Sequence, residues 1–154
     1  MYSNEIVLKL LNYIDNNINK KITMDELSHL FYFNKDYLMR IFKKELDITI
    51  MDYINKRRIY NSLDELKNTN YSMVKIAMNN GYSSQEYYSE TFSKIIGVNP
   101  LTYRKFTKVN SNISEDDYEI IRRNLTEINT ILRFIDRYKN NIPSTQVKKI
   151  SFFK

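Results

Sequence analysis

The 154-residue chain contains no cysteine, one histidine, two glycines and two prolines. Without cysteine it can form neither a disulfide nor a thiolate metal site, and one histidine, His29, is too few for a usual zinc centre. Turns between β-strands are rich in glycine and proline, so the scarcity of both favours long helices joined by few connections. We therefore expect an all-α protein that binds no metal and no other cofactor.

The chain also lacks the features of several functional classes. Its N-terminus has no signal-peptide pattern, and no apolar run is long enough to cross a bilayer. With one imidazole, no thiol and no glycine-rich phosphate loop, it is a poor candidate for an enzyme, and we assign no catalytic residue. The formal net charge of +6 favours a polyanionic partner. We expect a soluble, cytoplasmic, non-enzymatic protein.

Hydrophobic periodicity and helix-capping residues predict the helices. They cover about residues 3–18, 24–31, 35–46, 50–66, 73–80, 84–96, 101–106 and 115–140. Two capping boxes are predicted, Thr23 with Glu26 and Ser83 with Glu86, because each hydroxyl and each carboxylate can take an otherwise unpaired amide. Further N-caps are expected at Asn34, Ser72 and Ser114.

An internal repeat organises the first two thirds of the chain. Leu27 corresponds to Ile76 at an offset of 49 residues, whereas Phe42 corresponds to Phe92 at an offset of 50. One extra residue in the second turn accounts for the difference. The repeat predicts two related helix-turn-helix units, joined by the long helix at about 50–66.

The second helix of the first unit carries a concentration of positive charge. Residues 35–44 contain four basic side chains and one acidic side chain, a net charge of +3. An ordinary helix pair with a solvated basic face would give the same pattern. The second copy, with matching caps and aromatic residues, instead favours helices that enter the major groove of DNA.

Between about Ile22 and Phe106, the chain resembles the DNA-binding domain of the AraC/XylS transcription regulators. The resemblance is carried by three segments, ITMDELSHLFYFNKDYLMRIFKKELDIT, MDYINKRRI and SMVKIAMNNGYSSQEYYSETFSKIIGVNPLTYRKF. Its most specific parts are Tyr37-Leu38 with Arg40 and Phe42-Lys43, the Gly81-Tyr82-Ser83 turn, and Gly97-Val98-Asn99-Pro100 followed by Tyr103-Arg104.

The resemblance implies how the chain is organised. Residues 1–107 would form the double helix-turn-helix domain, and residues 108–154 a linker, an amphipathic helix and a tail. The long linker helix would hold two recognition helices for successive major-groove segments, about one helical turn (~34 Å) apart. The ligand-sensing domain that is usual in the family is not in this sequence.

The resemblance also implies which residues contact DNA. Base-reading positions on the first recognition helix are Lys35, Asp36, Met39 and Arg40, and those on the second are Ser84, Gln85, Glu86, Ser89 and Glu90. Phosphate contacts are expected from Thr23, Lys43, Lys44, Ser72, Lys94 and Lys105.

Two residues depart from the family pattern. Glu90 stands where an arginine is common; it could accept a hydrogen bond from cytosine, or it could repel the phosphates. Asp47 replaces the glycine that usually follows the first recognition helix, at some conformational cost.

The predicted C-terminal helix carries an apolar stripe with heptad spacing. Two interpretations remain open: the stripe docks on the chain's own helices, or it pairs two chains into a homodimer. The candidate interface residues are Tyr118, Ile121, Leu125, Ile128, Leu132 and Ile135.

These observations predict a sequence-specific transcription regulator that binds double-stranded DNA. By family habit it would be an activator, with RNA polymerase as a further partner. The alternative is a reduced relative that modulates another regulator through protein contact. A measurement of sequence-specific DNA binding separates the two.

Overall fold

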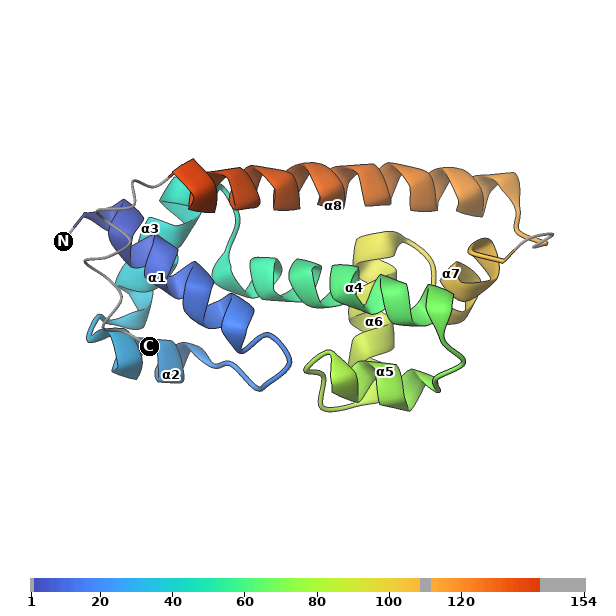
Figure 1. Cartoon of the computed structure of the whole chain (residues 1–154), viewed down its shortest axis with the longest axis horizontal. Coiled ribbons are helices and arrows are strands. Elements are labelled where there is room, and N and C mark those ends of the chain that lie inside the picture. The colour runs from blue at the N-terminus through green and yellow to red at the C-terminus, as the bar shows by residue number, and fades with distance from the viewer. Residues whose placement is uncertain (1, 109–111, 142–154) are drawn as a thin grey trace. The chain divides into compact units, whose positions relative to one another are not determined.

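The computed structural model describes residues 2–108 and 112–141. Over these residues every element of regular secondary structure is an α-helix, which confirms the predicted fold class (Figure 1). The helices are α1 (Ser3–Asn16), α2 (Met24–Phe31), α3 (Lys35–Leu46), α4 (Ile50–Asn68), α5 (Met73–Asn79), α6 (Gln85–Ile96), α7 (Pro100–Phe106) and α8 (Glu115–Asn141).

The chain divides into two compact units. Unit 1 comprises Met1–Ile54 and Leu132–Lys154, and unit 2 comprises Asn55–Ile131. Unit 1 contains the helix pair α2–α3, and unit 2 contains the pair α5–α6. Helices α4 and α8 are each divided between the units, so that one part of each helix belongs to unit 1 and the other part to unit 2. Each unit therefore has one of the two predicted helix-turn-helix motifs.

Unit 1 is built around the packing of α1 against α3. The apolar stripe of α1, which includes Leu10 and Ile14, is fully buried. On α3 the residues at helical spacing, Leu38 and Phe42, are equally buried. Burying side chains of this size is worth roughly 1.5–3 kcal/mol each. This packing fixes which face of α3 is left for solvent.

Unit 2 has an aromatic core. The ring centroids of Tyr82 and Tyr88 are 5.5 Å apart, those of Tyr88 and Phe92 5.8 Å, and those of Phe92 and Tyr103 5.7 Å. The hydroxyl of Tyr88 donates to the buried Oγ of Ser62 at 2.9 Å. Burial raises the pKa of Tyr88, so its phenol remains a protonated donor.

Two helices end at other residues than predicted. Helix α1 ends at Asn16 rather than near residue 18, because its C-cap Asn17 leaves the helical conformation (φ −122°, ψ 18°). The side-chain amide of Asn17 donates to the carbonyl of Tyr13 at this end. Helix α4 extends to Asn68, two residues further than predicted. There the backbone N–H and hydroxyl of Thr69 both donate to the carbonyl of Glu65.

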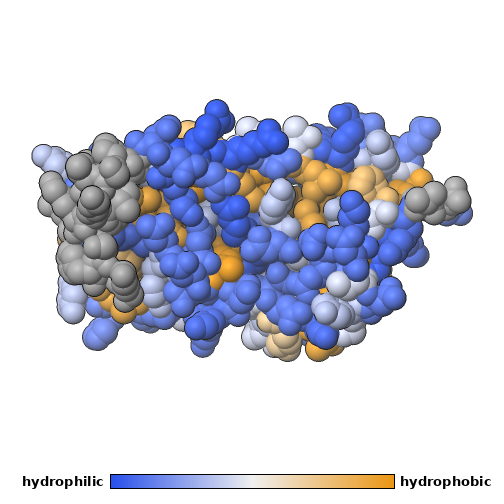
Figure 2. Space-filling model, viewed as in Figure 1, coloured by the Kyte–Doolittle hydropathy of each residue, from blue (hydrophilic) through white to orange (hydrophobic). Residues whose placement is uncertain are grey.

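Helix α8 buries most of its apolar stripe within the chain. Ile121, Ile128, Leu132 and Ile135 are each at most 3% exposed, whereas Tyr118 is about half exposed. The burial favours internal docking, and pairing of two chains through these residues would require α8 to leave this position. The outer surface of α8 is largely hydrophilic (Figure 2).

Within unit 1 the C-terminal part of α8 is also tied to α1 by a polar cluster. The ammonium of Lys139 lies 2.5 Å from one carboxylate oxygen of Asp15. The other carboxylate oxygen accepts a 2.6 Å hydrogen bond from the hydroxyl of Tyr53. The partly buried Asp15 thus connects three helices of the unit.

The internal repeat is visible in the backbone, and it locates the extra residue. The turns contain left-handed residues at Tyr32 (φ 59°) and Gly81 (φ 85°), 49 positions apart. The next N-caps, Asn34 and Ser84, are 50 positions apart. The extra residue therefore lies between Gly81 and Ser84, in the turn of unit 2.

Replacing Tyr32 with glycine is expected to stabilise the protein by about 0.5–1 kcal/mol. A non-glycine residue in the left-handed region costs about 1–2 kcal/mol, and the greater freedom of glycine in the unfolded chain cancels part of the gain. Tyr32 is 86% exposed, so little packing is lost. The midpoint of urea unfolding should rise, and Gly81→Tyr should lower it. A lower midpoint for Tyr32→Gly would contradict the assigned backbone strain.

Candidate nucleic-acid interface

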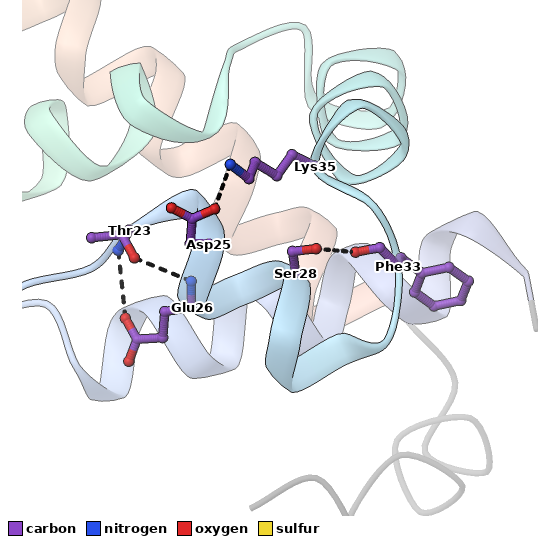
Figure 3. Close-up of polar contacts among 6 residues, drawn as sticks. All are labelled: Thr23, Asp25, Glu26, Ser28, Phe33 and Lys35. Atoms are coloured by element: carbon purple, nitrogen blue, oxygen red, sulfur yellow. Dashed lines mark hydrogen bonds and ion pairs between the residues drawn. The ribbon is translucent and has the colours of Figure 1, made fainter.

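The first helix-turn-helix corner is fixed by hydrogen bonds at both ends of α2 (Figure 3). The backbone N–H of Glu26 donates to the hydroxyl of Thr23 at 3.1 Å, and the N–H of Thr23 donates to the Glu26 carboxylate at 3.4 Å. This is the predicted capping box. At the turn, the hydroxyl of Ser28 donates to the carbonyl of Phe33 at 2.6 Å.

Helix α1 supports this corner through the same carboxylate. The hydroxyl of Tyr13 donates to Glu26 at 2.6 Å. Burial, with a further contribution from this hydrogen bond, raises the pKa of Tyr13 to about 12. The phenol therefore remains a donor at neutral pH, and α2 is held to α1 while α3 projects from the turn.

Helix α3 presents all of its predicted reading residues to solvent. Lys35, Asp36, Met39 and Arg40 are exposed, while the opposite face is buried in the core. The guanidinium of Arg40 lies 5.3 Å from the centre of the Tyr37 ring, so the side chain is supported along the outer face. The structure brings these four residues together on one surface.

Two basic side chains of α3 already have acidic or carbonyl partners. Lys35 forms an ion pair with Asp25 of α2 (Figure 3). Lys43 donates to the backbone carbonyl of Asp47 at 3.2 Å and lies 3.8 Å from its carboxylate. Both pairs are exposed, and such surface pairs contribute only about 0–1 kcal/mol. Breaking either pair would therefore cost little.

The second recognition helix begins one residue later than its predicted capping box. The N-cap of α6 is Ser84, whose hydroxyl accepts from the backbone N–H of Tyr87 at 3.1 Å. The capping box predicted for Ser83 with Glu86 is therefore wrong. Ser83 lies in the part of the turn that holds the extra residue, so it cannot occupy the N-cap.

The exposed face of α6 is acidic. Glu86 and Glu90 are exposed, and Ser84, Gln85 and Ser89 are half-buried. Over Gln85–Ile96, two glutamates and Lys94 leave a charge of −1, whereas over Lys35–Leu46 four basic and two acidic residues leave +2. The two predicted recognition helices thus carry opposite net charges.

The remaining predicted phosphate-contacting residues come from several helices. Lys44 of α3, Lys94 of α6 and Lys105 of α7 are exposed. Ser72 is the N-cap of α5 and accepts from the backbone N–H of Lys75 at 3.2 Å. Its hydroxyl oxygen caps the helix, as that of Thr23 does in unit 1, and a hydroxyl that accepts in this way can still donate its O–H to another group.

Two arginines in the described residues support the scaffold instead. Arg58 is buried, and its guanidinium lies 5.6 Å from the centre of the Tyr82 ring. Burial lowers the pKa of Arg58. Arg104 donates to the carbonyls of Leu66 and Tyr71 at 3.0 and 2.9 Å, so it ties α7 to the last turn of α4 and to the segment that follows it.

Other kinds of site find no support in the described part of the chain. Across residues 2–108 and 112–141, no three histidine, cysteine, aspartate or glutamate side chains are grouped so as to hold a metal ion. None of the helices in these ranges combines the length and apolarity needed to cross a membrane.

The geometry agrees with a known protein family. The family model described as a helix-turn-helix domain matches residues 27–105, just over half of the chain, from α2 into α7. The chain belongs to the AraC/XylS family. Members of this family are DNA-binding transcription regulators and not enzymes, as the sequence predicted.

Individual proteins with similar sequences are also named as HTH-type transcriptional regulators. An uncharacterized HTH-type transcriptional regulator of Bacillus subtilis, YbfP, is 30% identical over 118 residues, which are 77% of this chain and 40% of YbfP. The HTH-type transcriptional activator AarP of Providencia stuartii is 27% identical over 103 residues, which are 67% of this chain and 76% of AarP. This chain therefore spans well under half the length of YbfP but most of that of AarP.

A solved structure supports the family fold. The C-terminal domain of AraT, a response regulator from Geobacillus stearothermophilus, superposes with a TM-score of 0.65 at 27% sequence identity. The superposition covers 71% of this chain and 92% of that domain. Helix α8 lies beyond the segment matched by the AraC/XylS helix-turn-helix domain.

The N-cap of α6 is tested by alanine substitution at two neighbouring serines. Ser84→Ala should destabilise the protein by about 1 kcal/mol, because the N–H of Tyr87 loses its acceptor. Ser83→Ala should change stability by less than about 0.5 kcal/mol, as expected for an exposed residue that is not itself the N-cap. Urea unfolding measures both. Equal losses for the two variants would contradict the assignment of Ser84 as the cap.

Proposed function

We propose that this AraC/XylS member is a sequence-specific regulator that inserts α3 and α6 into the major groove of double-stranded DNA. The observation that best supports this proposal is the division of α3 into two faces. One face is buried in the core, and the opposite, exposed face presents Lys35, Asp36, Met39 and Arg40. A recognition helix requires this division, since one face holds it in place while the other meets base edges.

In the proposed complex, α3 provides most of the affinity and much of the sequence reading. Arg40 has the planar fork that binds the O6 and N7 atoms of guanine. Lys43 and Lys44 lie on the same helix one turn further on and contact phosphates. As the complex forms, Lys43 exchanges its protein carboxylate for a DNA phosphate, and Lys35 leaves Asp25 for a base edge.

Helix α6 contributes mainly to discrimination between DNA sequences. Ser84, Gln85, Glu86, Ser89 and Glu90 meet the base edges, where a glutamate accepts from the N4 amino group of cytosine. The same carboxylates repel the phosphates, so α6 binds weakly at a wrong sequence. The further phosphate contacts come from Lys94, Lys105 and the hydroxyls of Thr23 and Ser72.

The regulatory consequence we propose is activation of transcription. AarP, to which the chain is similar over two thirds of its length, is named a transcriptional activator. Activation would require contact with RNA polymerase at the promoter, in the cytoplasm. A role confined to protein contact through the α8 stripe has less support, because four of its six residues are buried in the chain.

The proposal is tested first at Arg40. Arg40→Ala should weaken binding to a DNA site selected from random sequence by about 1–3 kcal/mol, and should relax the preference at one base position. Arg40→Lys should also lose that preference, because lysine keeps the charge but not the two-pronged hydrogen bond. Mobility-shift titrations of full-length protein measure both effects.

The matched control for Arg40 is Arg123→Ala, which removes an exposed arginine from α8. It should leave affinity and base preference nearly unchanged. Failure of the unaltered chain to select any sequence would refute the proposed function. Equal losses for Arg40→Ala and Arg123→Ala would refute the assignment of Arg40 as a base-reading residue.

A second test uses the acidic face of α6. Glu90→Arg should raise affinity for non-specific DNA and steepen the slope of log affinity against log salt by about 0.9, as for one added phosphate contact. The control is Glu127→Arg on α8, where the exposed glutamate is reversed with the same change in net charge. If the two variants behave alike, Glu90 does not face DNA.

A further inference from the structure

Helix α8 covers the C-terminal end of the second recognition helix. The last carbonyls of a helix have no partner within it and must be satisfied from elsewhere. In unit 2 the side-chain amide of Asn124, on α8, donates to the carbonyl of Ile96 at 2.7 Å. Ile96 is the last residue of α6. A side chain from outside the family's matched segment therefore completes the end of a recognition helix.

The packing at this contact is close. Gly97 follows α6 with φ of 93°, in the left-handed region that favours glycine. A Cβ atom added to Gly97 would lie 2.2 Å from Cγ2 of Ile120 and 2.8 Å from Nδ2 of Asn124. Both residues belong to α8, so glycine is required here by the neighbouring helix as well as by the backbone.

The first recognition helix ends differently. Asp47 occupies the position equivalent to Gly97, with φ of 57°, and its side chain is fully exposed. Its own Lys43 donates to the carbonyl of Asp47. Helix α8 reaches the last turn of α3 through a contact between side chains, in which the hydroxyl of Tyr138 lies 3.5 Å from the carboxylate of Glu45. At the second recognition helix, by contrast, α8 donates to a backbone carbonyl at the helix end.

Helix α8 also reaches α6 through aromatic packing. The rings of Tyr118 and Phe106 are 5.5 Å apart, those of Phe106 and Tyr103 5.8 Å, and those of Tyr103 and Phe92 of α6 5.7 Å. Ile121, which is fully buried, lies on α8 between Ile120 and Asn124, the two α8 residues next to Gly97. Helix α8 therefore meets α6 directly at its end and indirectly through the rings of α7.

We propose that α8 is a positioning element for the second recognition helix, and that Asn124 is the positioning residue through which it acts. The inference rests on the proposed function. Helix α6 has a net negative charge and gains little from phosphate attraction, so its binding depends on being held in the correct geometry before DNA arrives. By fixing Ile96 and Gly97, α8 sets how tightly unit 2 engages its half of the DNA site.

The test is a footprint that resolves the two half-sites, using full-length protein with Asn124→Leu. Leucine keeps the size of the side chain but removes the donor to Ile96. We expect the concentration needed to protect the half-site under unit 2 to rise about fivefold, the effect of one lost hydrogen bond. The half-site under unit 1 should require the same concentration as before. Hydrogen exchange of the amides near Gly97 should become faster.

Two further variants separate positioning from general stability. Asn129→Leu makes the same change on the exposed side of α8, where Asn129 has a 3.4 Å contact with the hydroxyl of Tyr60, and should leave both half-sites unchanged. Gly97→Ala should displace α8 while keeping Asn124, and should reproduce the selective loss. Thermal unfolding of every variant shows whether it is folded.

Each outcome has one interpretation. Selective loss at the half-site under unit 2 for both Asn124→Leu and Gly97→Ala supports the positioning role. An equal loss at both half-sites, or no loss despite faster exchange near Gly97, overturns it while leaving the proposed function intact. Absence of any protection by the unaltered chain refutes the proposed function and this inference together.

Discussion

The architecture depends on burial of one face of each recognition helix. In unit 1, Leu38 and Phe42 pack into the core against α1, and in unit 2, Tyr88 and Phe92 occupy the equivalent places. Because 3.6 residues complete a turn, fixing these side chains also fixes which residues point outward. The chemistry of the outer face can then differ between the units without altering the fold.

Most of the fold was predictable because its signals are local. The Thr23–Glu26 capping box, the Asn34 N-cap and the apolar stripes each depend on residues within one or two helical turns of one another. The outward position of Arg40 follows from the same periodicity. Base contacts remain a prediction, since they depend on a partner and not on the chain alone.

The contacts that escaped prediction are those between residues distant in sequence. Periodicity shows that the α8 stripe must be buried, but it cannot say against what. Nothing near Asn124 in the sequence points to Ile96, 28 positions away. Ser83 and Ser84 are both good N-caps by type, and only the position of the extra turn residue decides between them.

That extra residue shows where the two halves of the chain are free to differ in length. It lies between the left-handed Gly81 and the N-cap Ser84, outside both helices that it connects. An insertion inside α6 would rotate every later side chain by about 100°, turning core residues outward and reading residues inward. In the turn, it changes the path of the backbone but keeps the phase of the helix. A difference in length between the two repeats is therefore tolerated at this point, and the reading face can change one residue at a time.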